Sequence, residues 1–157
     1  MSTLVAYFSA TGTTARAAKA LAEAIGADLF ELAPEQPYSA ADLNWNDKNS
    51  RSSREMADEK CRPAVTGDAP DTSAYDTVFV GFPIWWYVEP RIVDTFLEAH
   101  DFSGKTIVPF ATSGGSGLGK PQRMASLAPG ATVTEGRLLN GRLDANDLRA
   151  WAEGSAR

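Results

Sequence analysis

Apolar and polar residues alternate along the chain in blocks that predict strands followed by helices. The segments 4–8, 77–82 and 106–112 are short, apolar at nearly every position and rich in β-forming residues. Such runs are typical of strands that are buried on both faces of a parallel sheet. Apolar residues at helical spacing follow the first two runs, at 18–25 and 92–97. The pattern therefore indicates repeated strand–helix units.

The remaining blocks continue this alternation. Residues 28–32 and 132–139 predict two further strands, a short helix is expected at 121–127, and Asp144 is suited to cap a last helix. Strands that alternate with helices predict one α/β domain over residues 1–157, with a doubly wound five-stranded parallel sheet in the order 2-1-3-4-5. In that order the first, third and fourth strands lie side by side, and the loops at their carboxyl ends form one crevice.

One long segment, residues 34–73, interrupts the pattern with Pro, Asp, Asn, Ser and Gly. A structureless stretch of this length is unusual inside a compact domain, so we expect it to be functional or weakly helical. Its most polar part runs from Asn44 to Arg54 around a single tryptophan, Trp45. A solvated connection is an equally good interpretation of that part.

The loop after the first strand carries hydroxyl groups on both sides of one glycine and leads into an Ala-rich helical pattern. Hydroxyl groups, the free N–H groups of a starting helix and the positive end of the helix dipole are all suited to bind an anion. The alternative is a helix cap, in which one Ser or Thr satisfies the first N–H groups. Four hydroxyls exceed what a cap needs. We therefore predict a phosphate-binding site made of Ser9, Thr11, Gly12, Thr13 and Thr14.

Aromatic residues follow the third strand, where solvent begins. This aromatic loop, residues 83–88, includes Pro83, Ile84, Trp85, Trp86 and Tyr87. Burial in the core would explain one or two of these rings, but not readily all three beside an isoleucine. A wall for a flat ligand explains the others, because aromatic rings gain stacking energy with such a ligand.

Glycines dominate the loop after the fourth strand. This glycine loop, residues 113–119, directly follows Thr112 and includes Ser113, Gly114, Gly115 and Gly117. One interpretation is a flexible connection. The other is close approach of the backbone to a planar ring, where side chains would collide and N–H groups can reach ring heteroatoms.

Two nucleotide-binding motifs nearly match the glycine loop and fail. Gly114, Gly119 and Lys120 fit the G-x-x-x-x-G-K pattern, but Pro121 stands where the Mg²⁺-binding Ser or Thr belongs and removes a backbone N–H. This argues against nucleoside triphosphate hydrolysis. The dinucleotide-binding fingerprint is missing as well, because Gln122 occupies the position of its third glycine.

Composition and charge restrict the remaining function classes. The 157 residues carry a net charge of −5, which argues against nucleic acid and anionic membranes as partners. The single cysteine, Cys61, excludes an internal disulfide and a multi-cysteine metal site, and we expect no metal. We expect His100 to end a helix. No apolar run is long enough to span a membrane, and Met1 to Thr3 lead directly into the first strand, so a cytoplasmic protein is expected.

Together, a phosphate site in the first loop, an aromatic loop and a glycine loop that exposes its backbone fit flavin mononucleotide (FMN). Its phosphate would lie in the first loop and its isoalloxazine ring between the other two loops. Arg16 is the nearest positive residue, so neutral donors and the helix end would carry most of the phosphate charge. A response-regulator receiver has the same topology, but its chemistry needs an aspartate at the end of the third strand, where this chain has Phe82 and Pro83.

The loop motifs resemble those of the flavodoxin family. The pattern Ser9-x-Thr11-Gly12-x-Thr14 is similar to the family's phosphate-loop signature. Segments 81–87 and 111–117, and the polar stretch 44–51, look like those of a bacterial, short-chain flavodoxin-like subfamily. The resemblance covers nearly the whole chain. It implies that the residues named in the first loop bind the FMN phosphate, that residues 83–87 and 112–117, including Thr112, bracket the isoalloxazine ring, and that the protein transfers electrons through this cofactor.

One departure from the family leaves a second function open. Electron-carrier flavodoxins commonly cover one flavin face with an aromatic residue from the loop after the fourth strand, which here has only Ser and Gly before Leu118. Unless Trp45 covers that face, it stays open to a nicotinamide, a quinone or another small acceptor. We therefore expect either a carrier that docks to redox protein partners or an FMN-dependent NAD(P)H oxidoreductase. A fold that has lost its cofactor is a third possibility, against which the intact first loop argues. No catalytic side chain is identifiable, because the cofactor supplies the chemistry.

Overall fold

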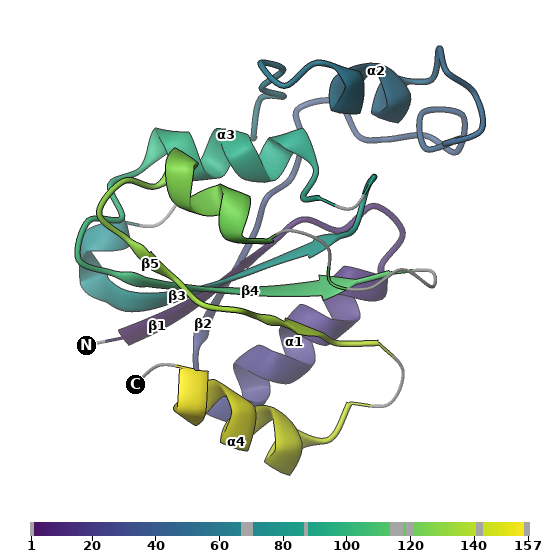
Figure 1. The fold of residues 1–157 in the computed structure, drawn as a ribbon. Coiled ribbons are helices and arrows are strands. Elements are labelled where there is room, and N and C mark those ends of the chain that lie inside the picture. Colours follow the sequence, from purple (N-terminus) through teal and green to yellow (C-terminus); the bar gives the residue numbers. More distant parts are fainter. Residues whose placement is uncertain are drawn as a thin grey trace.

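A parallel sheet in the order β2-β1-β3-β4-β5 forms the centre of the molecule (Figure 1). This computed structural model describes residues 2–66, 71–86, 88–113, 118, 121–140 and 143–155. The strands are β1 (Ser2–Tyr7), β2 (Asp28–Glu31), β3 (Tyr75–Pro83), β4 (Thr106–Thr112), β5 (Thr132–Val133) and β6 (Arg137–Leu138). All pairings between them are parallel. The predicted fold class and strand order are confirmed.

Helices cover both faces of this sheet, as Figure 1 shows. On one face lie α1 (Thr13–Ile25) and α4 (Ala145–Ser155), which contact each other. On the other lie α3 (Arg91–Ala99) and the 3-10 helix η2 (Pro121–Leu127). Residues along β1 alternate between the two faces. Leu4 and Ala6 belong to the core under α3, whereas Val5 and Tyr7 belong to the core over α1 and α4.

The predicted fifth strand over 132–139 is interrupted, and only its two ends pair with β4. Ile107 of β4 pairs with Val133, and Phe110 pairs with Arg137, so the fifth strand holds one extra residue between these pairs. Pro109 lies in this interval and has no N–H for the ladder. Gly136, with φ 77°, lies so close to Pro109 that a Cβ there would be 2.3 Å from the proline carbonyl oxygen. The sequence indicated the strand but not its break, because the break depends on the neighbouring chain.

The long polar segment is partly helical. It contains α2 (Arg51–Ala57) and the short η1 (Thr72–Ala74). Ser50 caps α2 by accepting a hydrogen bond from the Ser53 N–H. The weakly helical interpretation is thus confirmed for these residues. Figure 1 shows α2 beyond the sheet on the same side as α3. Within the described ranges, no helix is long and apolar enough to cross a membrane.

Candidate functional site

The strand register brings the three predicted loops together at one edge of the sheet. Tyr7, near the end of β1, pairs with Gly81, and Pro83 at the end of β3 pairs with Thr112 at the end of β4. The Phe8 N–H continues the ladder by donating to the Gly81 carbonyl at 2.9 Å. The first loop, the aromatic loop and the glycine loop therefore start side by side, as the sheet order predicted.

The first loop leaves the amino end of α1 without a side-chain cap. The N-cap residue is Gly12, whose φ of 96° lies in the left-handed region, and no side chain accepts from the first turn there. Residues with a Cβ rarely adopt this conformation, which explains the single glycine among hydroxyl residues. The first turn also has no acidic side chain. The N–H groups and the positive end of the helix dipole are thus open to an anion.

The hydroxyl groups of the first loop do not all have the same surroundings. Thr11 and Thr13 are exposed, whereas the Ser9 hydroxyl accepts a hydrogen bond from the Gly12 N–H at 3.0 Å and keeps its own proton to donate. Thr14 is buried and lies 2.7 Å from the hydroxyl of Thr112, also buried. Thr14 and Thr112 thus join the first loop to the end of β4. Thr11 and Thr13 are the side chains of the predicted set that are exposed to an anion.

The aromatic loop separates its two described tryptophans. The Trp85 ring packs edge-on against Phe8, with centroids 5.7 Å apart, and against Tyr38, at 5.5 Å. Trp86 is 45% exposed and is the described non-glycine residue with positive φ, at 50°. Backbone hydrogen bonds in both directions between Trp85 and Val88 hold this turn. Of these two rings, Trp86 is therefore the one that can face a ligand. Tyr87, also predicted for the wall, lies outside the described residues.

Ser113 and Leu118 are the described residues of the glycine loop, and Leu118 packs against the core under α3. The Ser113 N–H donates to Oδ1 of Asn140 at 2.9 Å, and Nδ2 of Asn140 donates to the Ser113 hydroxyl at 3.3 Å. The Thr112 carbonyl accepts from the Ile84 N–H at 2.9 Å, which joins this loop to the aromatic loop. The predicted residues Gly114, Gly115 and Gly117 lie outside the described residues.

Two residues that support the loops were not predicted. Asn140 follows the fifth strand, so its place at the carboxyl edge could have been inferred from the topology. Tyr38 lies in the polar segment and had no such signal. Its hydroxyl donates to Glu55, and the guanidinium of Arg51 lies 3.8 Å above its ring. Burial and the hydrogen bond to Glu55 raise the pKa of Tyr38 well above its usual range. Tyr38 thereby links α2 to the ring of Trp85.

Trp45, the predicted cover for a second ring face, is 71% exposed. It lies in a series of turns stabilised by its neighbours, among them the Asn46 N–H, which donates to the side chain of Asn44. The polar segment is thus ordered by local hydrogen bonds and leaves its tryptophan uncovered.

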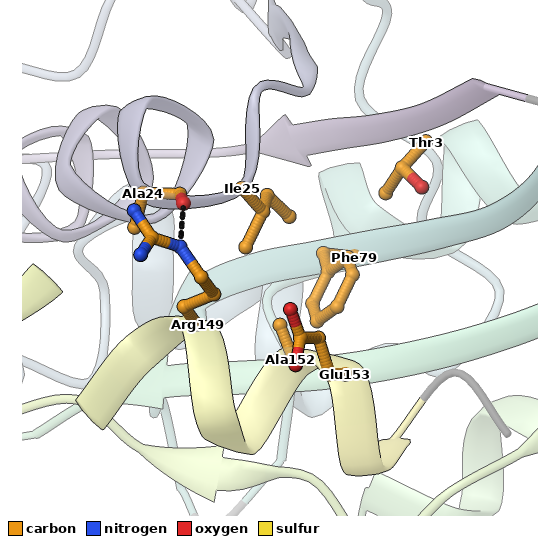
Figure 2. A pocket seen from close by; sticks show the side chains of 7 residues that line it. All are labelled: Thr3, Ala24, Ile25, Phe79, Arg149, Ala152 and Glu153. Carbon is orange, nitrogen blue, oxygen red and sulfur yellow. Dashed lines mark hydrogen bonds between the residues drawn. The ribbon is translucent and has the colours of Figure 1, made fainter. Parts of the chain in front are cut away.

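A hollow elsewhere in the molecule is separate from these loops (Figure 2). It is lined by residues from the first part of β1, the last turn of α1, β3 and α4, namely Thr3, Ala24, Ile25, Phe79, Arg149, Ala152 and Glu153. Arg149 donates to the Ala24 carbonyl at 2.9 Å. Because α1 starts at the carboxyl edge of the sheet, its last turn lies at the opposite edge. This hollow is therefore not part of the candidate site.

Comparison with known proteins identifies the family. A family model described as flavodoxin matches residues 2–155, so the chain belongs to the flavodoxin family. No curated protein sequence matches the chain.

Solved structures agree with this assignment. A crystal structure described as a flavoprotein from Bacteroides eggerthii is 54% identical, with a TM-score of 0.93, and the match covers 99% of this chain and 98% of that one. A similarly described protein from Bacteroides uniformis is 50% identical, with a TM-score of 0.90 and 97% of each chain covered. A flavoprotein from Lactobacillus acidophilus, solved in complex with FMN, shares the fold at 22% identity and a TM-score of 0.70, over 96% of this chain and 98% of that one.

Proposed function

We propose that this protein binds FMN at the carboxyl ends of β1, β3 and β4 and transfers electrons through it between redox protein partners. The observation that carries the proposal is the uncapped amino end of α1, beside an exposed Trp86 on the neighbouring aromatic loop. Bound FMN would supply the redox chemistry, and the protein's own groups would bind and orient it. The FMN complex of the Lactobacillus flavoprotein supports this choice of cofactor.

The phosphate would be bound by the first loop. Thr11 and Thr13 offer exposed hydroxyl groups, Ser9 retains a proton to donate, and the first N–H groups of α1 point toward the same place. Hydrogen bonds to a charged phosphate are stronger than those between neutral groups. The left-handed Gly12 allows the chain to turn without a side chain on the phosphate side of the helix end.

The isoalloxazine ring would lie against the aromatic loop. Trp86 provides an exposed ring, and the preceding Trp85 is held in place by contacts with Phe8 and Tyr38. Stacking of two aromatic rings contributes about 0.5–1.5 kcal/mol beyond the burial of their area. We assign the second wall to the glycine loop, as expected from the sequence.

Partner choice and location complete the proposal. A net charge of −5 favours basic docking surfaces on partner proteins, because complementary charge speeds association. We place the protein in the cytoplasm, where no nucleic acid or membrane is expected as a partner.

A visible spectrum of the purified protein with added FMN tests the cofactor. We expect flavin absorption bands to stay with the protein through gel filtration. Free protein and free FMN eluting separately would refute the proposal. As a control, Thr132→Val changes an exposed threonine of β5, outside the site, and should bind FMN like the wild type.

A second experiment separates the carrier from an enzyme. The 71% exposure of Trp45 favours an open ring face, which a nicotinamide could reach. For a carrier we expect reduction only through an added reductase and in one-electron steps. Steady oxidation of NAD(P)H by the protein alone, with a quinone as acceptor, would instead identify an FMN-dependent oxidoreductase.

A further inference from the structure

A cluster of charged side chains is buried behind the aromatic loop. Glu89 and Asp94 are fully buried, and Arg91 is nearly so. Arg123 and Arg62 complete the buried charge cluster, with side chains about one third exposed or less. Arg123 Nη1 donates a hydrogen bond to Oε1 of Glu89. The Asp94 carboxylate has three guanidinium groups around it, those of Arg91 at 3.5 Å, Arg123 at 3.7 Å and Arg62 at 3.9 Å.

The cluster joins segments that flank the candidate ring site. Glu89 is the residue directly after the aromatic loop. Arg123 belongs to η2, which begins two positions after the end of the glycine loop in the sequence. Arg91 donates to the Met56 carbonyl at 2.8 Å, at the end of α2. Because a buried group is destabilised when it loses a charged hydrogen-bond partner, the bond from Arg123 to Glu89 resists movement of the aromatic loop away from η2.

The aromatic loop needs such an anchor. Trp86 has a φ of 50°, a conformation that costs a residue with a side chain free energy and persists only when its surroundings hold it. On one side the Trp85 ring is held by Phe8 and Tyr38. On the other side, directly after Val88, the side chain of Glu89 is held by Arg123. Loss of the second anchor would let the turn relax.

We propose that Arg123 is a positioning residue of the flavin site, which acts through Glu89 to hold the aromatic loop, and Trp86 with it, against η2. The test of this inference by hydrogen exchange does not depend on the proposed function. The test by FMN binding does. Arg123 does not contact the cofactor in this assignment. Its effect is to keep the loop in the conformation that can bind the ring.

We infer that the two acidic groups of the cluster share one proton. Glu89 Oε2 and both carboxylate oxygens of Asp94 are buried without a hydrogen-bond partner among the described residues. A proton on Glu89, donated to Asp94, would satisfy atoms of both groups. Burial, this hydrogen bond and the Asp94 charge raise the pKa of Glu89 from an ordinary 4.5 to about 9, against the opposite effect of Arg123. This shift favours a protonated Glu89 at neutral pH.

Amide hydrogen exchange of the FMN-free protein is the first test of the inference. In Arg123→Gln, the N–H groups of Trp85 and Val88, which bond across the turn, should exchange at least about tenfold faster than in the wild type. Arg149→Gln is the control, because it makes the same substitution at an arginine that donates to the Ala24 carbonyl at the opposite edge of the sheet (Figure 2). Unchanged exchange at Trp85 and Val88 in Arg123→Gln would overturn the inference, whether or not the protein binds FMN.

FMN binding is the second test. If Arg123→Gln leaves the aromatic loop in its binding conformation only about a tenth of the time, the Kd for FMN rises about tenfold. The midpoint potential of the bound FMN should shift as well, and Arg123→Lys, which keeps the charge, should recover most of the affinity. A variant with reduced stability but wild-type Kd and potential would show a merely structural role. Failure of the wild type to bind FMN would refute the proposed function and leave the exchange result to decide the inference.

Glu89→Gln tests the shared proton and remains informative if Arg123→Gln does not fold. Glutamine has the shape of the protonated acid and cannot ionise. Above pH 4.5 the unfolded chain releases the Glu89 proton while the folded protein keeps it, so the stability of the wild type falls as pH rises toward 9, relative to Glu89→Gln. The charged groups that face Glu89 are those of Asp94 and Arg123, while Arg91 and Arg62 face Asp94, and both proteins retain all four. If the stability difference between the wild type and Glu89→Gln stays constant with pH, Glu89 and Asp94 do not share a proton.

Discussion

The first loop and the aromatic loop lie at the same edge of the sheet, but they differ in the residue at their left-handed position and in the contacts that stabilise them. The first loop places glycine at its left-handed position, Gly12, and is stabilised by a local hydrogen bond from Gly12 to Ser9, with one contact to β4 through Thr14 and Thr112. The aromatic loop places a tryptophan at its left-handed position, Trp86. It is held by rings and charges from distant parts of the chain, among them Tyr38 and Arg123.

This difference shows that the two halves of the candidate site depend on different parts of the chain. The anion-binding half needs little beyond its own residues and the start of α1. The proposed ring-binding half also contacts distant elements, α2 through Tyr38 and η2 through Arg123. Changes in the first loop should therefore alter ligand binding with little effect on folding, whereas changes around the aromatic loop should affect both.

The largest effect is expected from the exposed hydroxyls of the first loop. Thr11→Val with Thr13→Val removes two charge-assisted hydrogen bonds worth about 1.5–3 kcal/mol each, so FMN affinity should fall about a hundredfold or more. The stability of the FMN-free protein should change little, because both side chains are exposed. Fluorescence titration with FMN, beside Thr132→Val, measures the first effect. A wild-type Kd would place the phosphate elsewhere.

The buried threonine of the same loop should behave differently. Thr14→Val leaves the buried Thr112 hydroxyl without its partner, which should lower the free energy of unfolding by about 1–3 kcal/mol. The double change Thr14→Val and Thr112→Val removes both hydroxyls and should recover part of that loss. Urea denaturation of the FMN-free proteins measures both. Equal stability of the single variant and the wild type would show that the pair contributes nothing.

Backbone strain in the aromatic loop can be measured by comparing two substitutions at one position. Trp86→Ala and Trp86→Gly both remove the ring and should weaken FMN binding alike, by the stacking energy of about 0.5–1.5 kcal/mol. In the FMN-free protein, however, Trp86→Gly should be about 1 kcal/mol more stable than Trp86→Ala, because glycine adopts a positive φ without strain. Equal stability of the two variants would argue against strain at this turn.

The smallest effect is expected at Asn140. Asn140→Ala removes two hydrogen bonds to Ser113, but the site is exposed and water can replace them. We expect a loss of less than about 1 kcal/mol in FMN binding, hence a change in Kd of less than about fivefold. Asn146→Ala, an exposed asparagine in α4, is the control. A much larger loss would mean that the glycine loop depends on this side chain for its conformation.

Sequence patterns were sufficient for the strand order and for the location of the first loop, because individual strands, helices and this short loop motif can be recognised from neighbouring residues. Buried strands are apolar at nearly every position, and helices repeat their apolar residues every three or four positions. Strand order then follows from the general preferences of doubly wound sheets. The glycine and hydroxyl residues of the first loop lie within six positions of one another, so a short motif was enough to locate that loop.

Contacts between distant segments decided everything else about the candidate site. The sequence could not tell Trp85 from Trp86, because the choice depends on Phe8 and Tyr38. Nor could it show that Thr14 meets Thr112 or that Glu89 meets Arg123. These pairs are separated by tens of residues along the chain, and no local spacing relates them. They become neighbours only when the parallel strands align, since that alignment brings the ends of β1, β3 and β4 to one edge of the sheet.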